Sequence, residues 1–129
     1  MDRFKFRTYI KYAKLLEDVD SFFIDNLKEK ITFHFSSGHT KTMKLSDCDL
    51  EQCIGQKDKN GKLIYENDIV KDINGHYGYI KWDSEELKYF VCKRLGLVPY
   101  LTPCSMVHSY EYEIVGNIHQ NNELLNDNK

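Results

Sequence analysis

Polar and apolar residues alternate strictly near the start of the chain. Over residues 3–12 the side chains switch between two sets, and successive side chains of a strand point to opposite faces. One set is Phe4, Phe6, Thr8, Ile10 and Tyr12, and the other is Arg3, Lys5, Arg7, Tyr9 and Lys11. The pattern predicts a half-buried strand whose basic face is open to solvent.

The next segment supports two interpretations. Its apolar residues fit the 3.6-residue period of a helix; they are Tyr12, Leu15, Leu16, Val19, Phe22 and Phe23. The run 22–24 and the turn-like run 18–21 also suit short strands. Periodicity alone favours a helix here.

Alternation returns further along the chain. It holds over residues 31–35, breaks at Ser36-Ser37-Gly38 and resumes over 39–45. This pattern predicts a β-hairpin, with His34 on its solvent-exposed face. Two more strands are expected at 87–92 and 110–118.

The segment between these last two strands carries residues that interrupt regular structure. We predict a loop over residues 94–109, which contains Gly96, Pro99 and Pro103. The polar tail over 121–129 is expected to fray.

Two Asn-Gly pairs mark tight turns. Asn60-Gly61 and Asn74-Gly75 tolerate the positive φ angles of type I′ hairpin turns. The polar residues before the first pair indicate that it ends a loop rather than a long hairpin.

The register around Asn74-Gly75 can be predicted. A two-residue turn sets Ile73 opposite His76, Lys71 opposite Gly78 and Ile69 opposite Ile80, with Trp82 continuing that face. The prediction is a core cluster of Ile69, Ile80 and Trp82, and an opposite face that carries Val70, Tyr77 and Tyr79.

These elements amount to roughly seven to nine short strands and at most one or two short helices. The fold class is therefore mainly β: a small coiled sheet or an SH3-like barrel of short antiparallel strands with β-hairpins. With 129 residues, the chain is expected to form a single domain. Within it we expect an N-terminal β arm over about 1–50, a barrel-like part over about 51–120 and the frayed tail.

Composition adds little about partners. The 18 Lys and Arg against 20 Asp and Glu leave a net charge of −2, which is unlike the positive field of a duplex-coating protein. No apolar run approaches a membrane span, and the N-terminus lacks an apolar signal region, so a cytoplasmic protein without membrane contact is expected.

The cysteines and histidines give no metal signature. The four cysteines, Cys48, Cys53, Cys92 and Cys104, lack the Cys-x2-Cys spacing of a zinc site, and a reducing compartment predicts free thiols. The five histidines form no His-Glu-x-x-His motif. We therefore expect no metal and no cofactor.

Three segments, read together, carry a family resemblance. They are Phe4-Lys5-Phe6-Arg7, the run from Gly55 to Val70, and Tyr112-Glu113-Ile114-Val115-Gly116-Asn117-Ile118 followed by Asn122-Glu123-Leu124-Leu125. In order and spacing they resemble the YopX family of small phage and prophage proteins. The resemblance implies a mostly β fold, and it implies that residues 14–24 are the second arm of a hairpin rather than a helix.

The resemblance also bears on origin and on one turn. It implies a mobile-element protein that acts in the cytoplasm of a bacterial host, and the family has no established activity that would supply catalytic residues. The family usually has glycine where Asn67 stands, and asparagine is the next best residue at positive φ. The predicted structural turn residues are thus Asn60, Gly61, Asn67, Asn74 and Gly75.

Two groups of residues are candidates for binding. The lysines around the first Asn-Gly pair, Lys57, Lys59 and Lys62, suggest a phosphate-binding loop, but the Gly-x-x-x-x-Gly-Lys-Ser/Thr frame is missing and ordinary turn chemistry is favoured. The basic face formed by Arg3, Lys5, Arg7, Tyr9 and Lys11 suits a nucleic-acid backbone with one stacked base. The simpler interpretation is an edge strand kept soluble by charge.

No recognisable catalytic arrangement is present. The acidic pairs Glu85-Glu86 and Asp47/Asp49 have no partner that would make them general acid and base, and no serine lies in a nucleophile elbow.

The expected function is therefore a non-enzymatic phage or prophage accessory protein that binds a host or phage macromolecule, with a protein as the favoured partner. The alternatives are a nucleic-acid-binding module that uses the basic N-terminal strand, and a small-molecule-binding counter-defence protein, which needs a cavity that sequence does not reveal. Uncovered sheet edges also favour a homo-oligomer.

Overall fold

The computed structural model describes residues 4–85, 87–95, 98–103 and 111–127. Several residues named above lie outside this part: Arg3, Glu86, Gly96, Cys104 and the last two residues of the tail. The described residues form eleven β-strands and two short 3-10 helices, so the mainly β prediction is confirmed.

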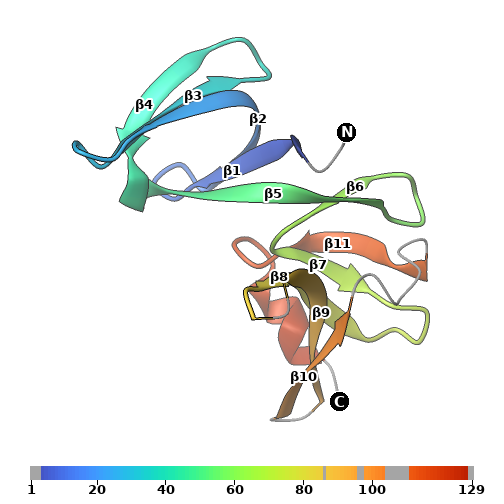
Figure 1. The fold of residues 1–129 in the computed structure, drawn as a ribbon. Coiled ribbons are helices and arrows are strands. Elements are labelled where there is room, and N and C mark those ends of the chain that lie inside the picture. The colour runs from blue at the N-terminus through green and yellow to red at the C-terminus, as the bar shows by residue number, and fades with distance from the viewer. Residues whose placement is uncertain (1–3, 86, 96–97, 104–110, 128–129) are drawn as a thin grey trace.

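The strands form two antiparallel sheets, which Figure 1 shows as an upper and a lower layer with β5 running between them. The six-stranded sheet has the order β4-β3-β2-β1-β5-β6. Its strands are β1 (Phe6–Ile10), β2 (Leu15–Asp25), β3 (Lys30–Phe35), β4 (Thr40–Lys44), β5 (Cys48–Lys57) and β6 (Leu63–Tyr65). The five-stranded sheet has the order β10-β9-β8-β7-β11. Its strands are β7 (Asp68–Lys71), β8 (Tyr77–Asp83), β9 (Lys88–Leu95), β10 (Val98–Pro103) and β11 (Glu113–Asn117).

Each sheet coils without closing into a barrel, so the coiled-sheet form of the prediction is the one that holds. The division between the sheets falls at residues 66–67, and β5 belongs to the first sheet. In the described part of the chain, no helix is long and apolar enough to span a membrane.

Residues 15–25 form β2, so the helix that periodicity favoured is wrong and the hairpin that the family resemblance implied is right. The apolar residues of β2 divide between two faces instead of forming a helical stripe. Val19 pairs with Phe6 and Phe22 pairs with Phe33, and all four lie in or against one core.

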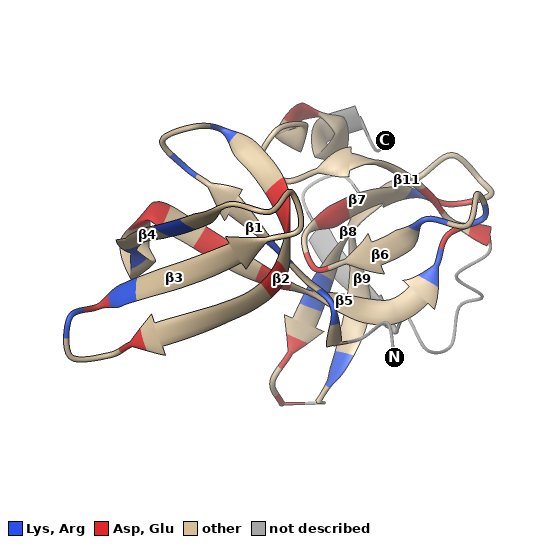
Figure 2. Cartoon of the chain, turned by 90° about the horizontal axis from the view of Figure 1, so that it is seen from above, with Lys and Arg blue, Asp and Glu red and all other residues tan. Residues whose placement is uncertain are grey.

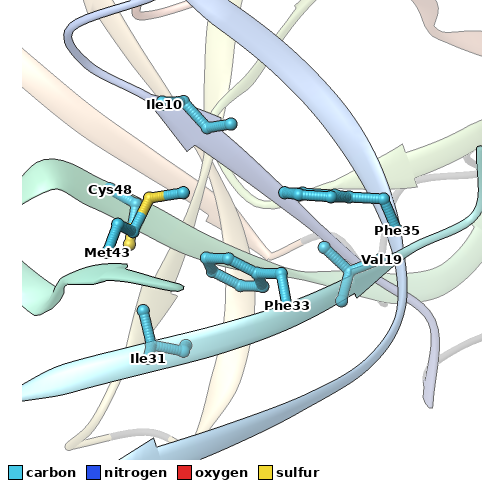
Figure 3. Packing of buried hydrophobic residues seen from close by; sticks show 7 residues of the cluster. All are labelled: Ile10, Val19, Ile31, Phe33, Phe35, Met43 and Cys48. Carbon is cyan, nitrogen blue, oxygen red and sulfur yellow. The ribbon is translucent and has the colours of Figure 1, made fainter. Parts of the chain in front are cut away.

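The curved six-stranded sheet encloses the first of two hydrophobic cores. Its buried members are Ile10, Val19, Ile31, Phe33, Phe35, Met43 and Cys48, which converge between the strands in Figure 3. The short helix η2 (Leu45–Asp47) joins β4 to β5 and closes one end of this core. The second core lies between the five-stranded sheet and β6, and its buried members are Ile64, Val70, Ile80, Val91 and Tyr112.

One prediction for the C-terminal part is wrong. Residues 98–103 form β10 within the predicted loop over 94–109; this strand lies at the sheet edge, where prolines are tolerated because one side needs no donor. In the predicted tail, residues 122–127 form the 3-10 helix η4 (Asn122–Asp127), which lies near β8.

Both Asn-Gly pairs lie in hairpin turns of the same kind. Each turn begins at an aspartate and ends at the residue that pairs with it, and three loop residues lie between the two. Asp72 Oδ1 accepts hydrogen bonds from the backbone N–H groups of Asn74 and His76, both at 2.9 Å. Asp58 Oδ1 accepts in the same way from Asn60 and Lys62. In each turn only the glycine has positive φ, +82° in both, so these are three-residue loops rather than type I′ turns. The first pair therefore closes the β5–β6 hairpin instead of ending a loop.

The longer loop shifts the β7–β8 register by one residue from the prediction. Ile69 pairs with Tyr79 and Val70 pairs with Gly78, because the closing pair is Asp72 with His76. A one-residue shift exchanges the faces of a strand. Val70 and Ile80 therefore share the core, whereas Trp82 is 42% exposed and the predicted cluster of Ile69, Ile80 and Trp82 does not form.

Gly75→Val is expected to destabilise the fold by about 1–3 kcal/mol, because φ of +82° is strained for a β-branched residue. Gly75→Asn is the matched control, since asparagine tolerates this conformation, and it should destabilise by less. Chemical denaturation measures both variants. Equal stability of Gly75→Val and the parent would contradict the turn geometry.

Candidate functional site

The basic face expected on the first strand is not a free surface. Arg7 and Tyr9 lie on the side of β1 that the second sheet and the turn at His119 cover, and both are buried or nearly so. Lys5 and Lys11 are exposed. The expectation of solvent on this face is wrong for its two central residues because alternation within one strand does not show a second sheet packed against it.

Arg7 lies at the centre of a charged cluster between the two sheets. Its Nε is 2.8 Å from Glu51 Oε1 on β5, and its Nη1 is 2.8 Å from Asp68 Oδ1 on β7. Its Nη2 donates to the Glu66 carbonyl at 3.1 Å, and the guanidinium lies 4.8 Å from the centre of the Tyr65 ring. Arg7 thus joins a carboxylate of its own sheet, Glu51, to the Asp68 carboxylate and the Glu66 carbonyl at the start of the second sheet.

Glu51 connects this cluster to the C-terminal turn. Its second oxygen, Oε2, accepts a hydrogen bond from Asn67 Nδ2 at 2.6 Å and lies 2.7 Å from His119 Nε2. The His119 ring stacks on Tyr9 with 4.1 Å between ring centres. We define the junction cluster as Arg7, Tyr9, Glu51, Asn67, Asp68 and His119.

Burial governs the electrostatics of this cluster. Burial raises the pKa of Asp68 to about 6, and the attraction of Arg7 only partly offsets it. Burial also raises the pKa of the neighbouring Glu66. For Arg7, burial alone would lower the pKa, but Asp68 and Glu51 together raise it, so the guanidinium keeps its charge.

We expect a pH effect on stability that Asp68→Asn removes. The folded protein binds the Asp68 proton up to about pH 6, whereas the unfolded chain releases it near the ordinary carboxyl pKa. Between these pH values the contribution of Asp68 to the free energy of unfolding therefore falls as pH rises. Denaturation of parent and variant across this window, with a carbon-13 titration of the carboxyl group, measures the effect. A titration midpoint at the ordinary carboxyl value would contradict it.

One side of the junction cluster opens to a groove. Arg7 and Asp68 line a hollow of about 400 Å³ together with Leu16, Asp18, Lys62, Leu63, Tyr65 and Ile114. Its walls mix both charge signs with apolar side chains. Arg7 and Asp68 bind each other in this hollow, so their charges join the two sheets.

Few features of the sequence point to the junction cluster. An aspartate directly before the buried Ile69-Val70 pair is one, since a carboxylate at the start of an apolar strand needs a partner. Glu51 and His119 carry no local signal, because they are 68 residues apart and meet only in the folded chain.

The candidate phosphate loop is placed at the β5–β6 turn. Lys57, Lys59 and Lys62 are exposed there, and Lys59 Nζ lies 3.5 Å from Glu113. The backbone N–H groups of Asn60 and Lys62 donate to Asp58, so these donors do not point at a ligand.

Three large apolar side chains are exposed near the end of the β2–β3 hairpin. Phe23 is 67% exposed and Leu27 is 98% exposed, and Ile24, which points to the other face of β2 from Phe23, is 38% exposed. Figure 1 shows this hairpin at the outer side of the first sheet, away from the second. We call Phe23, Ile24 and Leu27 the arm tip. The helical period of this segment did not predict that these side chains are exposed.

Comparison with known proteins identifies the family. A family model described as YopX protein matches residues 5–126. The chain belongs to the YopX family. Two expectations from the YopX resemblance are confirmed: residues 15–25 form a strand, and Asn67 has a positive φ of +67°.

The YopX-family chain is also similar to a solved structure, that of protein EF1440 from Enterococcus faecalis. The two are 22% identical, the match covers 94% of this chain and 96% of that one, and the TM-score is 0.54. At this identity the likeness shows a shared fold. No curated protein matches the chain.

Proposed function

We propose that this chain is a non-enzymatic accessory protein of a phage or prophage that binds another protein through the β2–β3–β4 arm. The observation that carries the proposal is the arm tip, where Phe23 and Leu27 are largely exposed to solvent and Ile24 is partly exposed. Large exposed apolar side chains on a projecting element are typical of protein-binding surfaces, where a few anchors supply most of the binding energy.

The charge distribution favours a protein over a nucleic acid as the partner. A nucleic-acid face needs cations that are free to reach phosphates. Arg7, the central cation of the proposed basic strand, is held by Glu51 and Asp68. Figure 2 shows both charge signs interspersed over the two sheets.

The family resemblance supports the mobile-element setting, and the junction cluster supports a structural use of the buried charges. Its members bind one another across the sheets, so the cluster fixes the position of the arm relative to the second sheet. A rigidly placed arm binds with less loss of conformational entropy than a mobile one.

The double variant Phe23→Ser, Leu27→Ser tests the proposal. Tagged parent and variant are used to capture proteins from host lysate, with nuclease added in parallel. We expect the parent to retain a partner that resists nuclease and the variant to lose it. Ile73→Ser is the matched control, because Ile73 is 78% exposed on a turn of the other sheet. Equal capture by parent, variant and control, or a partner lost to nuclease alone, would overturn the proposal.

A further inference from the structure

The edge strand of the arm, β4, has the features of a docking strand. It ends the six-stranded sheet and, among the described strands, has β3 as its one neighbour. The Phe35 N–H donates to the His39 carbonyl and the Leu45 N–H donates to the Glu29 carbonyl, which fixes the alternation of β4. Odd-numbered residues of β4 therefore bond to β3, and the peptide groups of Thr40 and Thr42 point to the open edge.

The side chains of this edge are basic and poorly neutralised. Lys44 lies directly opposite Lys30, and a like-charge pair in this position is unfavourable. Lys41 is also exposed and lies 4.9 Å from the Tyr12 ring. Within the described part of the chain, none of these three lysines has a carboxylate within 4.0 Å.

The outer face of the arm continues toward the same edge. Phe23 on β2 pairs with Thr32 on β3, and Thr32 pairs with Thr42 on β4, where the two hydroxyl groups are 2.8 Å apart. A strand added beside β4 would extend this row by one side chain next to Thr42, and would place a second one next to Lys44 on the same face.

We propose that β4 binds an extended acidic segment of a partner protein, which adds to the sheet as a further strand. A carboxylate of that segment neutralises Lys44 and Lys30, and a β-branched or apolar residue two positions away on the same face extends the Phe23-Thr32-Thr42 row. Lys41, on the other face of β4, adds to the attraction for a negatively charged segment. The recognition pattern is an acidic residue, any residue, then a β-branched or apolar residue. This inference rests on the proposed function and names its edge and its class of partner.

A second copy of the chain is a poorer occupant. Antiparallel self-pairing about Thr42 would place Lys44 beside Thr40 and Lys41 beside Met43 of the other copy, with two lysines from each chain along one seam. Like charges along a strand pair are destabilising. An acidic strand removes this repulsion and uses the same backbone groups.

The test uses the full chain labelled with nitrogen-15 and a short peptide of sequence Glu-Thr-Val-Thr-Glu, in which glutamate and valine alternate along one face of the added strand. We expect chemical-shift changes of the amide signals at residues 40–44 and slower amide hydrogen exchange at Thr40 and Thr42. Binding should weaken as the salt concentration rises, because salt screens the lysine charges. The same peptide with lysine in place of glutamate serves as the control and should not bind.

Two variants make the result specific. The double variant Lys30→Glu, Lys44→Glu should prefer the lysine peptide, changing the ratio of the two affinities by at least about tenfold. Thr42→Pro removes an outward donor that β3 does not use, so it should keep the fold and lose the peptide.

Lysines on an edge strand also discourage unwanted pairing. If that is their whole role, neither peptide binds the parent, and the inference is overturned. Peptide-induced chemical-shift changes confined to residues outside β4 would overturn it as well. So would peptide binding that the charge variant leaves unchanged. A partner that is lost from the Phe23→Ser, Leu27→Ser variant and retained by both β4 variants would overturn this inference and leave the proposed function standing.

Discussion

Replacement of Arg7 by methionine is expected to destabilise the fold by about 3–5 kcal/mol. Methionine keeps much of the side-chain volume but removes the charge. It leaves Glu51, whose side chain is 1% exposed, and Asp68, whose side chain is 3% exposed, without their cation. Chemical denaturation with two probes, one aromatic and one backbone signal, measures the loss and shows whether the two sheets still unfold together.

Lys11→Met is the matched control for Arg7→Met. Lys11 directly follows the same strand but is half exposed, and its Nζ is 3.9 Å from Asp49. Its replacement should change stability by less than about 1 kcal/mol. The Arg7 variant should also recover part of its stability at lower pH, because a buried carboxyl without a cation binds a proton more readily. Near-parental stability of Arg7→Met at neutral pH would show that the junction cluster does not hold the sheets together.

The second large effect is expected at Gly78. A Cβ atom there would lie 2.7 Å from Val91 Cγ1, 2.8 Å from Lys93 Cγ and 3.0 Å from the Cys92 carbonyl oxygen. The carbonyl belongs to the neighbouring strand and cannot turn away. We therefore expect Gly78→Ala to destabilise the fold by about 2–3 kcal/mol through overpacking.

Gly61→Ala separates this effect from backbone strain. Gly61 has positive φ and no atom within 4 Å of the added Cβ, so its replacement tests strain alone, whereas Gly78 tests contact alone. Combining Gly78→Ala with Val91→Ala should destabilise by less than the sum of the single variants, because the second change removes one of the crowding atoms. Strict additivity of the two changes would show that Val91 is not what crowds this position.

Alternation within single strands predicted local structure well and exposure poorly. It placed β1 and the β3–β4 hairpin, and it put His34 on the solvent side, where the structure has it. It failed for Arg7 and Tyr9 because both faces of β1 are covered, one by the first core and the other by the C-terminal turn. Alternation of apolar and polar residues indicates one buried face, but it does not show whether the polar face is also covered by another part of the chain.

The turns show a more local limit. Asn-Gly alone predicts a two-residue type I′ turn, but in this chain an aspartate stands two residues before each asparagine. That carboxylate accepts hydrogen bonds from two backbone N–H groups later in the chain. It stabilises a three-residue loop instead of a two-residue one, and the asparagine in this loop keeps a negative φ. The aspartate was visible in the sequence, and its capping role is what sets the register of β7 and β8.

The long sequence separations between Glu51 and its partners affect how the chain folds during synthesis on the ribosome. Its partners lie 44 residues before it, 16 after it and 68 after it along the chain. The buried members of the first core all lie within residues 10–48, so this core can assemble while the rest is still being made. Glu51 obtains its last partner, His119, only after residue 119 has been synthesised. We therefore expect the two sheets to dock after the first core has formed, and docking to be the slower of the two steps.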